Sequence, residues 1–363
     1  MYLQSLQLAN FKNYESGEFT FNEKVNAVVG ENGSGKTNLL DAIHYLSFCK
    51  SYFNSQDNLS VRFGADFFAI HGEFVGYDDD RTRKISCIYK SGGRKIMKFN
   101  QKEYERMSDH IGQYPLIMAA PVDSNLIHGG SELRRKFFDM ILSQFDKNYL
   151  QALISYQKLL MQRNTLLKQM FENGHYDAMF LQIYDDQMCP LADEIHQKRM
   201  LFTQEIQPFF QKYYEFLSES KEKVDIGYES ALADMPMAEI FRNNEQADYR
   251  SGYTCSGVHK DDFIFLMDGH SVKKFSSQGQ QKSFLLALKL AHFDYIYNKK
   301  KLKPILLLDD IFDKLDEKRI AQLLYLVGND HFGQVFLSNT DGARIERILS
   351  EHNIQYTMLT VGA

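Results

Sequence analysis

Apolar and polar positions follow a two-residue period, or form short apolar runs, through the first third of the chain. Tyr2–Leu8 and Gly17–Phe21 alternate, and Val25–Val29 is almost wholly apolar. Phe67–Val75 and Leu116–Ala119 have the same character. Alternation is typical of half-buried strands, and short apolar runs are typical of strands buried on both faces. We therefore predict a β-rich N-terminal third.

The period changes to that of a helix in the middle of the chain and returns to strands near the end. From Ser131 to about Leu217 the apolar residues recur three or four positions apart, which predicts a mostly helical middle third. Asn173-Gly174 is a candidate helix stop, and Pro190 and Pro208 are expected to start, kink or end helices. The strands predicted after Thr254 are Phe263–Leu266, Ile305–Leu308 and Val335–Ser338.

A glycine-rich loop stands between the Val25–Val29 strand and an apolar helical segment, Asn38–Leu46. The loop fits G-x-x-x-x-G-K-[ST], and this strand–loop–helix context favours a phosphate site over a chance glycine-rich turn. Its glycines let backbone N–H groups point inward around phosphates. Lys36 is expected to reach the β- and γ-phosphates, and Thr37 to hold Mg²⁺. The predicted nucleotide-binding residues are Gly30, Glu31, Asn32, Gly33, Ser34, Gly35, Lys36 and Thr37.

A second part of the site is predicted where the Ile305–Leu308 strand ends in Asp309-Asp310. A buried strand followed by two acids can supply the magnesium carboxylate, here Asp309, although a solvated acidic pair is the alternative. Thr37 and Asp309 are 272 positions apart. The sequence therefore predicts one sheet interrupted by an insertion, with the helical middle as the inserted part.

A polar segment, Ser276–Ser283, precedes an apolar helix some 30 residues before Asp309. Alone it reads as an ordinary helix N-cap. In this position it resembles the signature loop of ABC-type ATPases, with Ser277, Gly279 and Gln280 facing a nucleotide. Asp313–Asp316 then falls where those ATPases carry their D-loop.

These motifs together resemble the SMC/RecN-like group of ABC-type ATPases, and within that group the RecF family most closely. Leu8–Tyr14, Leu133–Asp139 and Gly257–Asp262 extend the resemblance to nearly the whole chain. It implies an α/β fold: a P-loop ABC-type ATPase head with an inserted helical lobe. The boundaries expected on this basis give a head from residues 1–125 and 253–363 and a lobe from residues 126–252.

The resemblance implies an ATP-dependent DNA-binding protein in recombinational repair of single-strand gaps, replication restart and SOS induction. ATP and Mg²⁺ would drive a homodimer onto duplex DNA and single-strand/duplex junctions. RecR is the implied partner, with RecO and RecA acting downstream. An SMC-like chromosome-handling ATPase is the first alternative, but no sustained heptad is visible. A P-loop kinase or GTPase is the second, but no N-K-x-D motif occurs and the Ser276–Gln280 segment is left unexplained.

Three positions depart from the pattern common in ABC-type ATPases. Ala120–Asp123 follows the Leu116–Ala119 strand without the usual glutamine, and Asn339-Thr340 stands where transporters carry a γ-phosphate-sensing histidine. The second acid is Asp310 rather than glutamate, and its shorter side chain suggests slow hydrolysis, which suits a switch. The implied catalytic residues are Asp310, Asp309 and Lys36.

The candidate DNA surface is a basic hairpin. The chain has a net charge of −5, so any nucleic-acid contact must come from a local patch. Residues 81–102 hold eight basic side chains and no acidic one, and we single out Arg94, Lys95 and Lys98 as phosphate contacts. A solvated hairpin face is the alternative. His259, Lys260, Asp261 and Asp262 match a family motif whose chemistry spacing does not show, and they could brace the lobe against the head.

Cysteine spacing and hydropathy bear on the compartment. The four cysteines are far apart and form no C-x-x-C pair, as expected for free thiols in a reducing cytoplasm. No apolar stretch approaches the ~20 residues that span a bilayer, so no membrane association is predicted.

Overall fold

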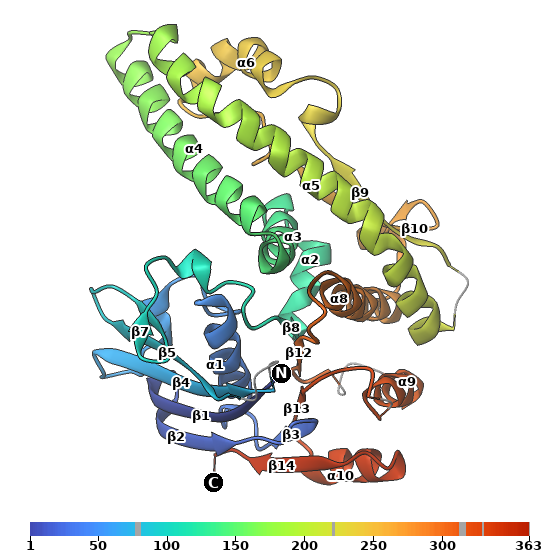
Figure 1. Cartoon of the computed structure of the whole chain (residues 1–363). Helices are drawn as coiled ribbons and strands as arrows, with labels where there is room; N and C mark the ends of the chain where they lie inside the picture. The colour runs from blue at the N-terminus through green and yellow to red at the C-terminus, as the bar shows by residue number, and fades with distance from the viewer. Residues whose placement is uncertain (77–80, 220–221, 312–316, 329, 363) are drawn as a thin grey trace. The chain divides into compact units, whose positions relative to one another are not determined.

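The computed structural model describes residues 1–76, 81–219, 222–311, 317–328 and 330–362 (Figure 1). The chain divides into two compact units. The first, here the α/β unit, comprises Met1–Ser124, Lys212–Lys221 and Ser277–Ala363. The second, the helical unit, comprises Asn125–Gln211 and Glu222–Ser276.

A five-stranded parallel sheet forms the centre of the α/β unit, in the order β14-β3-β13-β12-β8. Its strands are β3 (Val25–Val29), β8 (Leu116–Ala119), β12 (Ile305–Leu308), β13 (Val335–Asn339) and β14 (Tyr356–Thr360). Every residue of β3, β8, β12 and β13 is buried, as their apolar runs predict for strands covered on both faces. Strands from the two ends of the chain thus share one sheet, as the sequence predicts.

An antiparallel sheet forms the second layer of this unit, in the order β2-β1-β4-β5-β6-β7. Its strands are β1 (Tyr2–Phe11), β2 (Tyr14–Thr20), β4 (Phe67–Val75), β5 (Arg83–Lys90), β6 (Ile96–Phe99) and β7 (Lys102–Glu103). The predicted basic hairpin is therefore confirmed as β5 and β6. Helix α1 (Lys36–Phe48) packs against strands of both sheets, which explains why almost all of its side chains are buried.

The remaining helices of the α/β unit lie mostly in the C-terminal part of the chain. They are α8 (Gln278–Lys300), α9 (Glu317–Gly328) and α10 (Gly342–Glu351), with short 3₁₀ turns at Asp57–Ser60, Met107–Asp109 and Pro121–Ser124. Among the described residues, no helix is long and apolar enough to cross a membrane.

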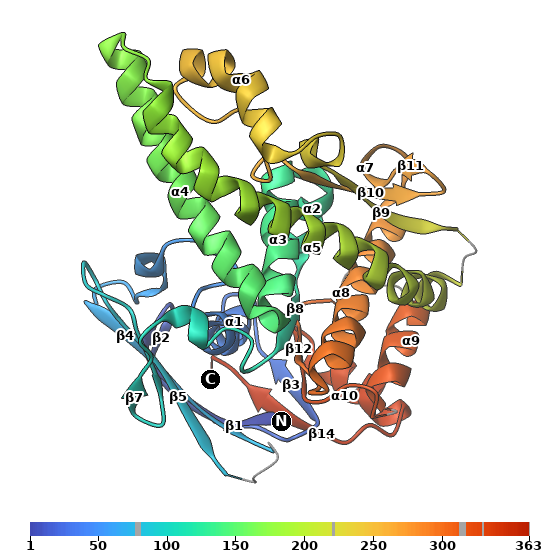
Figure 2. The same cartoon turned by 45° about the horizontal axis from the view of Figure 1, so that its top comes forward.

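The helical unit is built on long helices, as predicted. They are α3 (Ser131–Phe145), α4 (Lys147–Asn173), α5 (Ala178–Ser218) and α6 (Met237–Ser251), with the short α2 (Asn125–His128), α7 (Val272–Phe275) and 3₁₀ turn Ala231–Ala233. The last residues of α5, from Lys212 on, belong to the α/β unit. Helix α4 runs alongside the first part of α5 in both views (Figures 1 and 2). Gly174, in the left-handed region, caps α4, so the predicted stop is confirmed. Pro190 and Pro208 lie inside α5, so they neither start nor end a helix, and a kink is the one of the three expected outcomes that remains.

The second predicted boundary, at residue 253, needs correction. A small sheet of β9 (Val224–Glu229), β10 (Asp262–Met267) and β11 (His270–Ser271) belongs to the helical unit. All six residues of β10 pair with β9, so the chain stays in this unit until Ser276. Of the three strands predicted after residue 254, only Phe263–Leu266 was assigned to the wrong unit, because a strand's partner is not encoded in its own pattern.

The Gly257–Asp262 motif lies wholly within the helical unit, where its polar side chains are held internally. The Arg199 guanidinium donates to both Asp139 oxygens at 3.0 Å and to Asp261 Oδ2 at 2.9 Å. Arg134 forms a bidentate pair with Asp262 at 2.7 and 2.8 Å. Asp261 and Asp262 are therefore braced inside one unit, and the expectation that the motif braces the lobe against the head stays a prediction.

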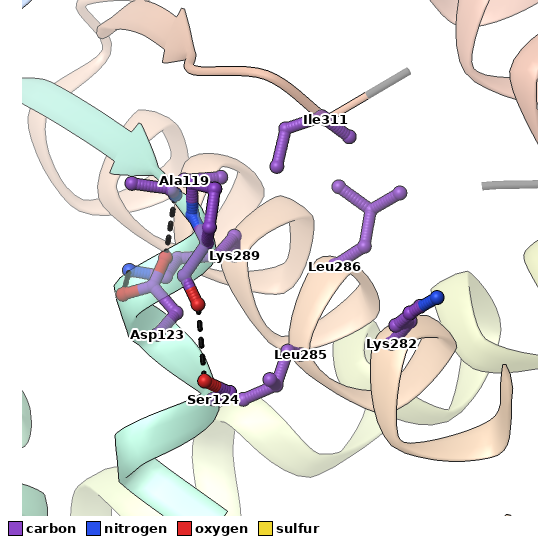
Figure 3. A pocket seen from close by; sticks show the side chains of 10 residues that line it. Ala119, Asp123, Ser124, Lys282, Leu285, Leu286, Lys289 and Ile311 are labelled. Atoms are coloured by element: carbon purple, nitrogen blue, oxygen red, sulfur yellow. Dashed lines mark hydrogen bonds and ion pairs between the residues drawn. The ribbon is translucent and has the colours of Figure 1, made fainter. Parts of the chain in front are cut away.

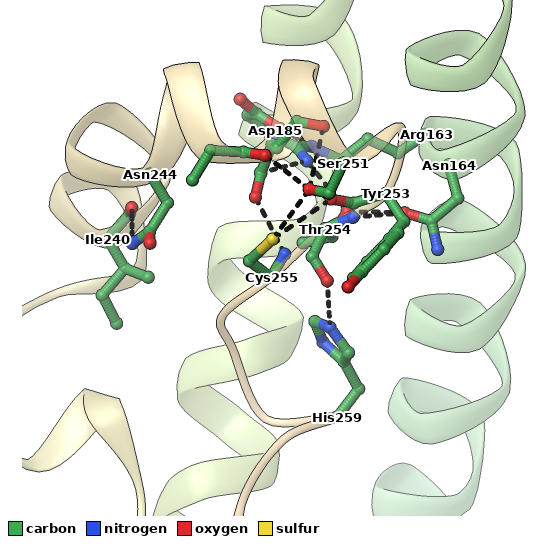
Figure 4. Close-up of polar contacts among 12 residues, drawn as sticks. Arg163, Asn164, Asp185, Ile240, Asn244, Ser251, Tyr253, Thr254, Cys255 and His259 are labelled. Carbon is green, nitrogen blue, oxygen red and sulfur yellow. Dashed lines mark hydrogen bonds and ion pairs between the residues drawn. The ribbon is translucent and has the colours of Figure 1, made fainter.

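A second buried arginine organises the opposite side of the motif (Figure 4). Arg163 donates to Asp185 at 2.6 Å, to Asp248 at 2.7 Å and to the Thr254 hydroxyl at 2.8 Å. His259 lies 3.0 Å from the Thr254 carbonyl oxygen and so donates to it, and its other ring nitrogen accepts from a tyrosine hydroxyl. Burial lowers the pKa of His259 to about 4, so this ring is neutral near pH 7.

Replacing Arg199 by methionine should destabilise the helical unit strongly. Asp139 and Asp261 would remain buried without their counter-charge, a loss of about 3–5 kcal/mol. The matched control is Lys136→Met, which breaks the exposed pair with Glu132 and should cost at most about 1 kcal/mol. Urea unfolding with hydrogen exchange on α3 and α5 measures both variants. Equal stability of the two variants would contradict the role given to Arg199.

Candidate nucleotide-binding site

The two halves of the predicted site meet at the carboxyl edge of the parallel sheet. Only β13 separates β3, which leads into the glycine loop, from β12, which ends at Asp309. The Thr37 hydroxyl lies 3.1 and 2.9 Å from the two Asp309 carboxylate oxygens and donates to them. Residues 272 positions apart are thus hydrogen-bonded, so the two separated segments form one site.

Backbone conformation and sterics explain the glycines of the loop. Gly33 and Gly35 have φ angles of 82° and 113°, in the region that favours glycine. A Cβ on Gly35 would come within 2.6 Å of the Asn13 side-chain nitrogen. Lys36 opens α1, and its ammonium donates to the Gly30 and Glu31 carbonyls at 2.9 Å each. The lysine is therefore held over the loop by contacts that a phosphate group could replace.

The turn between β1 and β2 supports the loop, a contact that reasoning from the glycine motif missed. Asn13 donates to the Ser34 carbonyl at 3.0 Å, and the Tyr14 hydroxyl donates to the Gly35 carbonyl at 3.0 Å. The Asn38 side-chain amide of α1 donates to the side-chain oxygen Oδ1 of Asn13 at 2.7 Å. The Leu8–Tyr14 motif was visible in the sequence, but its place beside the loop depends on the sheet pairing.

The two acids after β12 have different surroundings. Asp309 is 2% exposed and also accepts from the Ser338 hydroxyl at 2.7 Å. Burial raises the pKa of Asp309, and its hydrogen bonds from Ser338 and Thr37 oppose that shift. Asp310 has a φ of 47°, and its buried Oδ1 has no hydrogen-bond partner within the described part of the chain. Asp309 is thus fixed toward Thr37, whereas Asp310 keeps an acceptor available.

This set of groups fits a nucleotide with magnesium. The glycine loop and the α1 N-terminus suit phosphates, and Lys36 supplies a buried counter-charge. Mg²⁺ usually takes one or two carboxylates and completes its shell with phosphates and water, so Asp309 and the Thr37 hydroxyl suffice on the protein side. In the described ranges no group of three or more His, Cys, Asp or Glu side chains could hold a metal. Bound there, Mg²⁺ would neutralise phosphate charge.

The predicted signature loop forms the first turn of α8. Ser277 is exposed and caps the helix: its hydroxyl accepts from the Gln280 N–H at 3.2 Å, and Gln280 Oε1 accepts from the Ser277 N–H at 2.7 Å. This is a capping box, the ordinary reading considered above. A Cβ on Gly279 would meet nothing closer than 3.8 Å, so packing does not require glycine there. A nucleotide role for these residues stays a prediction.

Two further predicted features lie after β12 and at the end of β13. Asp313–Asp316, the proposed D-loop, lies outside the described residues. Asn339 is buried in β13, and its side-chain oxygen accepts from the Asp341 N–H at 2.7 Å. That bond begins the cap of α10, so the geometry of Asn339 is accounted for locally.

The basic hairpin is less one-sided in space than in sequence. Lys95 pairs with Asp57 at 2.7 Å with only 14% of its side chain exposed, and Arg94 pairs with Glu103. Lys98 lies on the opposite face of β6, in a hollow with His71 and Ser86. The three residues therefore do not share one surface, and Lys95 is a poor phosphate contact. Acids from outside the basic window neutralise it, which a window count cannot reveal.

Residues after β14 also pack on the glycine loop. The Val361 N–H donates to the Val29 carbonyl at 2.8 Å. A Cβ on Gly30 would come within 2.4 Å of the Val361 carbonyl oxygen, and one on Gly362 within 2.7 Å of the Ser34 Cβ. The C-terminal strand therefore restricts the shape of the loop, which no local motif indicates.

Comparison with known proteins places these observations among proteins of DNA repair. A family model described as the RecF/RecN/SMC N terminal domain matches residues 2–62. The DNA replication and repair protein RecF of Flavobacterium johnsoniae is 44% identical, with 99% of this chain and 100% of that protein covered. RecF of Bacteroides thetaiotaomicron is 43% identical, with 99% and 97% covered.

Solved structures give the same result. The recombination mediator protein RecF-ATPrS in the RecFOR pathway matches with a TM-score of 0.87 and 28% identity, covering 99% of this chain and 97% of that one. RecF-ATP matches with a TM-score of 0.87 and 29% identity, covering 94% and 92%. An Smc head bound to the C-winged helix domain of ScpA has a TM-score of 0.55 and 17% identity, covering 95% and 91%, which shows the fold alone.

Gly362→Ala should weaken ATP binding by about tenfold, because an added Cβ would push Ser34 and deform the loop, a cost of roughly 1.4 kcal/mol. Gly64→Ala is the matched control. Gly64 has a φ of 84° against 86° for Gly362, but nothing lies within 4 Å of its Cβ position. Isothermal titration with ATP·Mg²⁺ compares them. If both variants bind ATP equally well, the contact with Ser34 does not set the loop.

Proposed function

This chain belongs to the RecF family of DNA replication and repair proteins, and we propose that it is an ATP-dependent DNA-binding switch. Its fold is that of an SMC-like ABC-type ATPase with an inserted helical lobe. ATP·Mg²⁺ binds at Gly30–Thr37 and drives dimerisation on DNA, and slow hydrolysis releases the dimer. The protein acts where single-strand gaps are repaired and replication restarts, and in SOS induction.

The single observation that carries the proposal is the hydrogen bonding of Thr37 to Asp309 at the sheet edge. It joins a phosphate loop and a magnesium carboxylate from opposite ends of the chain, as ATP·Mg²⁺ binding requires. Lys36 binds the β- and γ-phosphates. Asp310, with its available carboxylate oxygen, orients the attacking water. Because aspartate reaches less far than glutamate, hydrolysis is slow and the ATP-bound state persists.

The dimer has a composite site in this proposal. Ser277, Gly279 and Gln280 of one chain face the nucleotide held by Gly30–Thr37 of the other. The exposure of Ser277 at a helix N-terminus supports this arrangement, because its N–H groups and hydroxyl attract an anion. Two ATP molecules are thereby buried between two chains, so ATP bound to each monomer stabilises the dimer.

DNA and protein partners follow from family membership. The solved relatives are named as recombination mediators of the RecFOR pathway. We expect this chain to bind duplex DNA and single-strand/duplex junctions, with RecR as partner and RecO and RecA acting downstream in the bacterial cytoplasm. Arg94 and Lys98 remain the proposed phosphate contacts on the hairpin. An SMC-like chromosome-handling ATPase or a P-loop kinase is disfavoured, because curated RecF proteins match 99% of this chain.

Lys36→Ala should weaken ATP binding roughly 10- to 150-fold, since charge-assisted hydrogen bonds contribute about 1.5–3 kcal/mol. Titration of the monomer with labelled ATP·Mg²⁺ measures the affinity. Lys24→Ala, which removes an exposed pair with Asp330, is the control and should bind normally. Unchanged affinity in Lys36→Ala would refute the phosphate-loop assignment.

Ser277→Arg should bind ATP as a monomer with normal affinity but fail to dimerise, because a bulky cation would block docking against the partner's nucleotide. Light scattering with and without ATP·Mg²⁺ and gapped DNA gives the molecular mass. Lys274→Ala, an exposed change three residues earlier, should dimerise like the wild type. Normal ATP-dependent dimers of Ser277→Arg would remove the trans-acting role of this serine.

A further inference from the structure

A buried lysine joins three segments of the α/β unit. Lys289 of α8 is 2% exposed, and its ammonium donates to the Tyr52 hydroxyl at 2.7 Å, to the Met118 carbonyl at 2.7 Å and to Asp123 Oδ1 at 3.0 Å. The Tyr52 hydroxyl donates in turn to Asp123. Figure 3 shows Lys289 reaching from α8 to Asp123, which follows β8. The cluster thus connects α8, the end of β8 and the segment after α1.

The polar groups of this cluster pair with one another inside the fold. Burial lowers the pKa of Lys289, and the Asp123 carboxylate opposes that shift. Burial and the same carboxylate raise the pKa of Tyr52 far above its usual value, so its hydroxyl is neutral. Three acceptors match the three ammonium protons. A buried ion pair contributes little net stability over an apolar replacement, but it can fix one arrangement of the elements that it joins.

The cluster continues toward the phosphate loop through Asp41, which is fully buried in α1. Asp41 Oδ1 accepts from the Tyr52 N–H at 2.7 Å, and Asp41 Oδ2 lies 2.6 Å from the Lys12 ammonium. Lys12 directly precedes Asn13 and Tyr14, whose side chains hold the loop carbonyls. The phosphate loop is therefore connected to α8 through the β1–β2 turn, the Lys12–Asp41 ion pair and Tyr52, which bonds Asp41 through its backbone N–H and Lys289 through its hydroxyl.

The other end of the cluster lies beside the magnesium strand and the signature helix. Ala119, next to Met118, pairs with Leu308, and its carbonyl accepts from the Asp309 N–H at 2.8 Å. Lys289 lies on the helix that begins with the Ser277 cap. Asp123 is also the last residue of Ala120–Asp123, the segment that lacks the glutamine found at this place in many ABC-type ATPases. Its Oδ2 accepts from the Ala120 N–H at 2.8 Å.

A cavity beside the ion pair leaves space for small shifts of α8. It has a volume of about 280 Å³ and is lined by Asp123 with its neighbours after β8, by Leu285 and Leu286 of α8, and by Ile311 (Figure 3). Side chains that border a cavity have room to shift, whereas close-packed contacts would resist such a shift. The ion pair is a directional contact between α8 and the segment after β8, in addition to the packing of α8 on β8 itself.

We propose that Tyr52, Asp123 and Lys289 form a positioning link that transmits occupancy of the phosphate loop to α8. A bound phosphate draws Lys36 from the loop carbonyls, the β1–β2 turn follows, and Lys12 and Asp41 pass the shift to Tyr52. The link thereby sets where Ser277–Gln280 stand for docking against a second chain. None of the three residues belongs to the phosphate loop or to the Thr37–Asp309 pair. The inference rests on the ATP-driven dimerisation proposed above.

The first test is Tyr52→Phe, which removes one hydroxyl and keeps the Lys289–Asp123 pair. The monomer should bind ATP within twofold of wild type, while ATP-driven dimerisation weakens about three- to tenfold, the effect of one hydrogen bond. Tyr213→Phe is the matched control: its hydroxyl bonds His331, which contacts Asp294 of α8, but not the segment after α1. Wild-type dimerisation by Tyr52→Phe, or the same loss in Tyr213→Phe, would overturn the proposal.

The second test is a double-mutant cycle that separates a link from independent contributions. Lys12→Met and Tyr52→Phe should together weaken dimerisation no more than the worse single variant, because each breaks the same series. Fold-losses that multiply would show independent effects and refute the link. If Tyr52→Phe fails to fold, Lys289→Met/Asp123→Leu replaces the pair with apolar groups and gives the same readout. Absence of ATP-driven dimers in the wild type would instead refute the proposed function.

Discussion

The pairing of β3, β13 and β12 in one parallel sheet is the constraint on which the rest of the molecule depends. Parallel strands present their carboxyl ends at the same edge, so the glycine loop and Asp309 meet there although the chain between them is long. The strands are buried on both faces, so helices must cover them and short connections do not suffice. The helical unit is accommodated as an insertion between strands of a sheet that closes only when the C-terminal segment returns.

Buried charges give each unit a fixed internal arrangement. In the helical unit Arg199 gathers Asp139 and Asp261 from distant segments, and in the α/β unit Lys289 gathers Asp123 and Tyr52. Such pairs gain little net energy because both charges lose their hydration. Such pairs instead fix the arrangement of the elements around them. A guanidinium or ammonium has a set number of N–H donors, and the surrounding helices must be placed so that each donor has an acceptor. As a consequence, each unit keeps one internal arrangement, and in the α/β unit this arrangement holds the nucleotide-binding residues in place.

The phosphate loop owes its shape to three separate elements as well as to its own glycines. The β1–β2 turn holds its carbonyls, α1 continues it, and residues after β14 limit its outer side. Gly35 and Gly362 are required where side chains of Asn13 and Ser34 come closest. These contacts hold the loop in a shape that can bind phosphate. A change in the loop backbone on phosphate binding would also move the elements that contact it.

The sequence by itself determined the phosphate loop, the Asp309 strand, the helical middle and the existence of a split sheet. These depend on local periodicity and on chain distance, both of which can be read without partners. Tertiary structure decided what depends on a distant partner. Strand β10 pairs with β9, Lys95 forms an ion pair with Asp57, and Pro190 lies inside a long helix. Strand pairing and ion pairing are satisfied across the fold, so no window of residues contains the information that selects them.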